Sequence, residues 1–167
     1  MLDQRAAVRR TEGGQVGEVD LRRLLERWGA DAPLEKRATT TSWIAPRGLR
    51  ALQERLKKLD TRYTVTGSLA ASLRAPVAAP RVVSVYVEDP EAFAAEADLR
   101  TADAGANVLL LVPDDDYVFE DTWTEKQIRF AALSQVVADL LSGPGRGPAE
   151  ADALLAWMND NEEAWRG

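Results

Sequence analysis

The chain has 167 residues and a net charge of −6, and it contains neither cysteine nor histidine. The lack of both residue types excludes a disulfide framework, a Ser-His triad, a cysteine nucleophile and a typical zinc site. No apolar stretch approaches the roughly 20 residues that cross a bilayer, and the charged N-terminus is unlike a signal peptide. We therefore expect a cytoplasmic protein without a metal ion or another cofactor.

The first part of the chain predicts a hairpin, two amphipathic helices and an extended segment between the helices. Val8–Val16 forms the hairpin, because its central Gly-Gly pair supplies the positive φ of a tight reversal. Asp20–Trp28 forms a helix that its first residue caps, with leucines at helical spacing. Ala38–Ile44 is Thr-rich and forms a strand or an extended connection, and Pro46–Leu59 is the second helix.

The rest of the chain mixes predicted strands and helices without strict alternation. The expected strands are Thr61–Thr66, Arg81–Val87, Asn107–Val112 and Gln127–Ala132, and the expected helices are Leu69–Arg74, Glu91–Ala97, Leu133–Leu141 and Pro148–Asn161. Asn107–Val112 is almost wholly apolar, which predicts a central strand. Ser134 is the expected N-terminal cap of the Leu133–Leu141 helix. The pattern predicts an α+β fold, a mixed sheet with packed helices, preceded by a helical arm.

Two loops carry glycines in the pattern that binds phosphate. Gly67 and Ser68 lie between a strand and a helix, as a glycine-serine pair does in nucleotidyltransferases. Those enzymes add two carboxylates one residue apart on the next strand, whereas here only Glu88 and Asp89 occur, adjacent and at the strand end. An active enzyme is therefore the minor alternative, with Gly67, Ser68 and Glu88 as its nucleotide site. In the favoured interpretation, Gly67 makes a turn and Ser68 caps the helix.

The second such loop, Gly143–Pro148, lies between the last two predicted helices. It can form an anion-binding nest to which Arg146 adds positive charge. No Lys-Ser/Thr pair follows at the spacing of a P-loop. We therefore favour a loop that sets the angle between two helices.

Charge is unevenly distributed along the chain. Met1 to Arg62 carries 14 Lys and Arg against 9 Asp and Glu, a net +5, whereas Tyr63 to Gly167 carries 7 against 18, a net −11. The basic part suggests contact with a nucleic-acid backbone; the candidate residues are Arg5, Arg9, Arg10, Arg22 and Arg23. The acidic part suggests contact with a basic protein surface; the candidate residues are Asp114, Asp115, Asp116, Glu120, Asp121 and Trp123. In the simpler interpretation, both are ordinary solvated surfaces.

Two segments resemble a known family. Arg62–Ala71, with Tyr-x-x-Thr-Gly-Ser-x-Ala, is similar to the opening of the C-terminal domain of AbiEi-family antitoxins, which belong to type IV toxin–antitoxin systems. Ile128–Leu141 resembles the family's strand and its helix with Ser-x-x-x-x-Asp-Leu-Leu, and a Pro/Gly break follows as in the family. The resemblance extends over about Ala45–Trp157.

The resemblance implies an antitoxin or transcriptional regulator, and in the family the cognate toxin is a nucleotidyltransferase. Family members usually carry an N-terminal winged helix-turn-helix that binds their own promoter. Here the helix-turn-helix is missing, and Ala7–Asp20 is similar to the end of a wing. We expect a wing remnant and linker helix over 1–44 and an α+β domain over 45–167.

These observations together favour a non-catalytic module that binds a protein partner, such as a nucleotidyltransferase-type toxin, and assign no catalytic residue. A DNA-binding fragment that acts through the basic N-terminal region is a further alternative.

Overall fold

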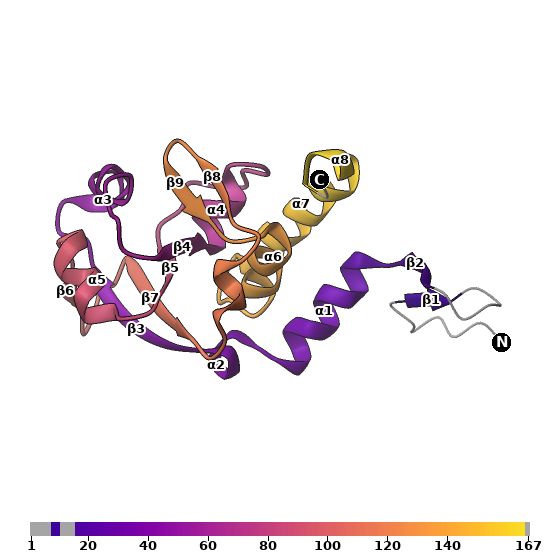
Figure 1. Cartoon of the computed structure of the whole chain (residues 1–167), viewed down its shortest axis with the longest axis horizontal. Coiled ribbons are helices and arrows are strands. Elements are labelled where there is room, and N and C mark those ends of the chain that lie inside the picture. Colours follow the sequence, from indigo (N-terminus) through magenta and orange to yellow (C-terminus); the bar gives the residue numbers. More distant parts are fainter. Residues whose placement is uncertain (1–7, 11–15, 166–167) are drawn as a thin grey trace.

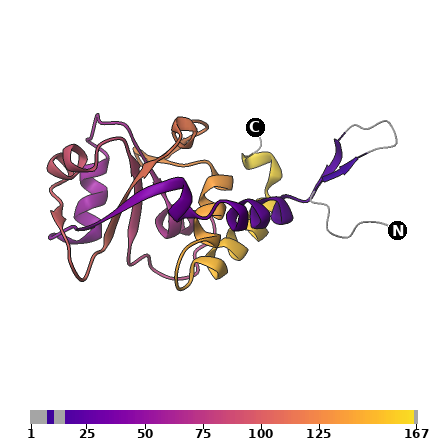
Figure 2. The same cartoon turned by 90° about the horizontal axis from the view of Figure 1, so that it is seen from below.

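The computed structural model describes residues 8–10 and 16–165 (Figure 1). β1 (Val8–Arg10) and β2 (Val16–Val19) pair antiparallel, which confirms the expected hairpin, although its Gly-Gly pair lies outside the described residues. α1 (Leu21–Asp31) begins as predicted, because the carboxylate of Asp20 accepts a hydrogen bond from the backbone N–H of Arg23 at 3.1 Å. The hairpin stands at the outer end of α1, away from the rest of the chain (Figures 1 and 2).

The remaining strands form one seven-stranded mixed sheet in the order β6-β3-β7-β5-β4-β9-β8. They are β3 (Ala38–Ile44), β4 (Tyr63–Thr66), β5 (Val83–Val87), β6 (Arg100–Thr101), β7 (Val108–Pro113), β8 (Trp123–Glu125) and β9 (Ile128–Phe130). β5 pairs parallel with β7, and β4 pairs parallel with β9, while the other neighbours are antiparallel. With the helices described next, this sheet confirms the expected α+β class.

Helices lie at both ends of the sheet region. They are α2 (Leu34–Arg37), α3 (Gly48–Leu56), α4 (Gly67–Ser72), α5 (Pro90–Ala97), the 3₁₀ helix η1 (Asp116–Phe119), α6 (Leu133–Leu141), α7 (Gly147–Asp160) and α8 (Glu162–Trp165). α3 and α5 lie at one end, and α6 and α7 lie at the other with α1 beside them (Figures 1 and 2). No helix in the described part of the chain is long and apolar enough to cross a membrane.

The apolar strand β7 is central, as predicted. Val108, Leu110 and Leu111 are fully buried. The side chains of Val108 and Leu110 belong to the main core, whereas Leu111 packs with Tyr86 and Val118 in a smaller cluster. Burial on both faces explains why this strand is a continuous apolar run rather than an alternating one.

Element boundaries differ from the sequence predictions at several places. Ser134 does not cap α6, because the helix already begins at Leu133 and Ala132 is the residue before it. The last predicted strand is shorter at its start, because Lys126 and Gln127 adopt left-handed φ values of 50° and 65° in the β8–β9 turn. The second amphipathic helix, α3, lacks the expected first and last residues.

The arm before the sheet is packed against it. Leu25 of α1 is buried in the main core, and a Cβ atom at Gly29 would lie 3.5 Å from the Cβ of Leu141 on α6. β3 pairs with β7 from Ala38 opposite Pro113 to Trp43 opposite Val108. A division at 44/45 would therefore separate β3 from the two strands that it pairs with.

Candidate functional site

The Gly67–Ser68 turn is the junction at which α4 follows β4 directly, so these two residues begin the helix instead of preceding it as predicted. Gly67 has a φ of 68°, in the left-handed region that glycine adopts at little cost. Ser68 does not cap α4, because Thr66 precedes the helix. Its hydroxyl instead donates to a carboxylate oxygen of Glu150 on α7, at 2.5 Å. The turn is thus joined to a helix that begins some 80 residues further along the chain.

Glu88, the third residue of the nucleotide-binding alternative, lies at the other end of the strands. Because β4 and β5 are antiparallel, Thr66 is opposite Ser84, whereas Val87, which precedes Glu88, is opposite Tyr63. Glu88 accepts a hydrogen bond from Arg62 Nη1 at 2.9 Å. The structure therefore does not bring Glu88 together with Gly67 and Ser68. No group of three acidic side chains in the described residues is arranged to hold a metal ion.

The two glycine-containing loops, distant in sequence, line one cavity of about 220 Å³. Its polar wall contains Ser68, Ser84, Asp139 and Glu150, its apolar wall contains Leu34, Val82, Leu109 and Leu140, and Arg81 and Arg146 line it as exposed residues. Gly147 of the Gly143–Pro148 loop lies close against α6, because a Cβ atom there would collide with the carbonyl oxygen of Leu140. The loop connects α6 to α7, and these two helices pack against each other.

Asp139, on α6, is the most heavily bonded side chain at this cavity. It is 4% exposed, and it accepts hydrogen bonds from Thr66 Oγ1 at 2.6 Å, Tyr86 Oη at 3.0 Å and Gln135 Nε2 at 2.8 Å. Arg37 Nη1 adds an ion pair at 3.0 Å. Burial raises the pKa of the Asp139 carboxyl above its ordinary value, and the surrounding donors and the guanidinium oppose that rise.

Arg37 connects the Asp139 cluster to the N-terminal arm. Its Nε atom donates to the carbonyl oxygen of Ala32 at 2.5 Å, and its guanidinium lies 5.0 Å from the centre of the Trp28 ring. One side chain therefore contacts α1, the α1–α2 connection and α6. Sequence reasoning missed this cluster, although an aspartate among the apolar residues of α6 was a visible signal.

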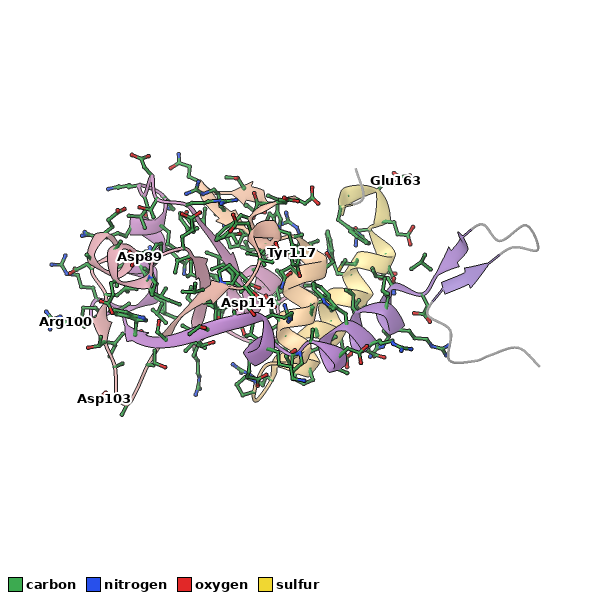
Figure 3. The ribbon with its side chains drawn as sticks, turned by 60° about the horizontal axis from the view of Figure 1, so that its bottom comes forward. Asp89, Arg100, Asp103, Asp114, Tyr117 and Glu163 are labelled. Carbon is green, nitrogen blue, oxygen red and sulfur yellow. The ribbon has the colours of Figure 1, made fainter. Side chains whose placement is uncertain are left out.

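The predicted acidic partner surface forms a structured turn after β7. Asp114, Asp115, Asp116, Glu120 and Asp121 are all exposed. The Asp115 carboxylate accepts from the Tyr117 backbone N–H at 3.3 Å at the start of η1, and Asp116 pairs with Arg62 at 3.5 Å. In Figure 3, Asp114 and Tyr117 are labelled near each other, and Asp103 lies at the tip of a separate loop.

Trp123, assigned to the same partner surface, is half-buried rather than exposed. Its ring stacks on Phe130 with 4.7 Å between centroids, and its indole N–H donates to the carbonyl oxygen of Ala131 at 2.8 Å. The Arg74 guanidinium lies 4.3 Å from the centre of the Trp123 ring. Trp123 therefore has packing partners within its own chain.

The predicted basic surface is only partly within the described residues. Arg5 lies outside them, and Arg9 and Arg10 belong to β1. Arg22 forms ion pairs with Glu26 at 2.8 Å and with Asp152 at 2.5 Å; the bond to Glu26 and the charge of Asp152 raise the pKa of its guanidinium. Arg23 pairs with Asp20 at 3.3 Å. Carboxylates thus partly neutralise the two arginines on α1.

Comparison with known proteins identifies the family. No curated protein and no solved structure matches the chain. The family model described as the transcriptional regulator, AbiEi antitoxin, of type IV toxin–antitoxin systems matches residues 19–158. This match spans the sheet, the arm helix α1, the cavity and the Asp139 cluster. The chain therefore belongs to the AbiEi family of antitoxins and transcriptional regulators.

Proposed function

We propose that the chain acts in the cytoplasm as the non-catalytic part of its toxin–antitoxin system, and that it neutralises a nucleotidyltransferase-type toxin by direct contact. The observation that carries this proposal is the exposed acidic turn over Asp114–Asp121. Its carboxylates follow a central strand and flank a 3₁₀ helix, so the backbone holds them in fixed positions. A fixed acidic surface favours a basic partner and accelerates its association.

The acidic turn makes the proposal testable by charge removal. The test variant combines Asp114→Asn, Asp115→Asn, Glu120→Gln and Asp121→Asn. Asp116 is left intact because it pairs with Arg62. Asn at 115 keeps an oxygen that can cap η1, so the turn is expected to fold as before.

Binding to the product of the neighbouring gene is measured by surface plasmon resonance at several salt concentrations. The association rate constant of the variant is expected to fall about tenfold or more and to lose its salt dependence. The control combines Asp103→Asn with Glu163→Gln, two exposed carboxylates elsewhere on the molecule (Figure 3). The control is expected to bind like the unmodified chain. Rescue of toxin-poisoned cells without measurable binding would contradict direct contact.

A DNA contact through the N-terminal arm is the second proposal. Its support is the position of the β1–β2 hairpin, which carries Arg9 and Arg10 at the outer end of α1 (Figure 1). A contact of arginines with phosphates predicts promoter affinity that falls steeply with salt, with a slope near −0.9 per phosphate contacted. The combined change of Arg5, Arg9 and Arg10 to Gln is expected to flatten that slope. A slope that does not change would remove these residues from the DNA interface.

A further inference from the structure

The cavity beneath the Gly67–Ser68 turn contains a buried carboxylate that has no cationic partner in residues 8–10 and 16–165. Glu150 is 4% exposed, and the Ser68 hydroxyl is its side-chain partner among the described residues. A buried carboxylate is ordinarily paired with a cation or several donors, because its desolvation is costly. Asp139, in the same wall, follows this rule with four donors, whereas Glu150 does not.

Two cations that form no ion pair within the described part of the chain line the same cavity. Arg81 and Arg146 are both exposed, and neither guanidinium has an ion pair or a side-chain hydrogen bond with any described residue. They come from different segments, the approach to β5 and the loop before α7. The cavity therefore combines a negative group in its interior with two positive groups that face solvent.

The shape and lining of the cavity restrict the occupant. A volume of about 220 Å³ is below the roughly 300 Å³ at which ordinary ligand pockets begin. It is too small for a nucleoside triphosphate. Leu34, Val82 and Leu109 contribute apolar side chains to its wall.

We propose that this cavity binds a small zwitterion with an apolar body, of the α-amino acid class. The ammonium group donates to Glu150, the carboxylate accepts from Arg81 and Arg146, and the apolar side chain lies against Leu34, Val82 and Leu109. Each charged group of the ligand thus meets a protein group that has no ionic partner among the described residues. Asp139 lines the cavity and pairs with Arg37, whose guanidinium lies over Trp28 of α1, so the ligand would bind next to this contact with the N-terminal arm.

The test is calorimetric titration of the full chain with probes that differ by one charged group. L-leucine and L-valine carry both charges, isovalerate lacks the ammonium group, isoamylamine lacks the carboxylate, and inorganic phosphate is an anion alone. At least one of the two amino acids is expected to bind, and at least tenfold more tightly than the three other probes. Equal binding of isovalerate or phosphate would overturn the proposal in favour of an anion site. The absence of heat with both amino acids at millimolar concentration would also overturn it.

Two variants test whether the amino acid binds in this cavity. Glu150→Gln keeps an oxygen that can accept from Ser68, so the fold is expected to persist while amino acid affinity falls about tenfold or more. Arg146→Ala changes an exposed loop residue and is expected to weaken binding similarly. The control is Asp160→Asn, an exposed carboxylate of the same helix α7 outside the cavity. If Arg146→Ala and Glu150→Gln both bind like the control, the ligand does not occupy this cavity.

Discussion

Separation of the Arg37–Asp139 ion pair is expected to destabilise the whole fold. The perturbations are Arg37→Met, which keeps the aliphatic part of the side chain, and Asp139→Asn, which keeps the shape of the carboxylate. The two side chains are 12% and 3% exposed, so water screens the pair little. Removal of one partner from a buried pair leaves an uncompensated charge and costs about 3–5 kcal/mol.

The expected loss of folding stability differs between the two variants because Arg37 and Asp139 have different surroundings. Arg37→Met leaves the Asp139 carboxylate with three neutral donors from Thr66, Tyr86 and Gln135, so we expect a loss of about 3 kcal/mol. Asp139→Asn leaves a guanidinium that is slightly exposed and can turn towards water, so we expect about 2–3 kcal/mol. The double variant is expected to lose at least 1 kcal/mol less than the sum of the single variants.

The assay is urea denaturation followed by tryptophan fluorescence, because Trp28 contacts Arg37 directly. With an m value of about 2 kcal/mol/M, a loss of 3 kcal/mol lowers the urea midpoint by about 1.5 M. Hydrogen exchange supplies a second readout. Relative to the unmodified chain, Arg37→Met is expected to accelerate exchange more at the amides of α1 than at the amides of the sheet. Midpoints that shift by less than about 0.3 M in both single variants, or additive losses, would refute the reasoning.

Three further predictions concern backbone fit and tyrosine ionisation. Gly147→Ala is expected to lower the free energy of unfolding by about 3 kcal/mol, because the Cβ of the alanine would collide with the Leu140 carbonyl oxygen. In the control, Gly29→Ala, the new Cβ makes an ordinary 3.5 Å contact, and stability is expected to change by less than about 0.5 kcal/mol. Gly67→Ala has room for its Cβ but keeps a φ of 68°, so thermal unfolding is expected to reveal a loss of about 1–2 kcal/mol; an unchanged melting temperature would contradict a strained turn. Burial raises the pKa of all three tyrosines, so their near-ultraviolet absorbance is expected to titrate at higher pH in the folded chain than in the urea-unfolded chain. Because the folded chain holds these protons more tightly, its stability is expected to fall as the pH rises above about 10. Identical titration curves for the folded and unfolded chains would contradict this. The tyrosines are Tyr63, Tyr86 and Tyr117.

Local features of the fold were predictable because they depend on near neighbours. The Asp20 cap lies three residues from the N–H that it accepts, and the apolar run in β7 by itself indicates a strand buried on both faces. The family resemblance was also readable from two short segments, and the match over 19–158 confirms it. The same local reasoning gave the wrong role to Ser134 and to Ser68, because it could not weigh distant partners against a cap.

The candidate site depended on contacts that sequence spacing does not encode. Ser68 and Glu150 are 82 residues apart, and Arg37 and Asp139 are 102 residues apart. Glu88 is near Ser68 in the chain but lies at the far end of the strand pair, because β4 and β5 run antiparallel. Two loops that were assessed separately as phosphate-binding patterns turned out to line one cavity.

The sequence by itself determined the class of fold, the strand and helix types and the family, because periodicity, turn φ values and capping act within a few residues. The tertiary structure alone decided which polar groups meet. Strand order and direction fix which loops share an edge of the sheet, and helix packing then brings Asp139 and Glu150 to that edge. Whether a buried charged side chain stabilises or destabilises the fold depends on the partners that this packing brings within reach.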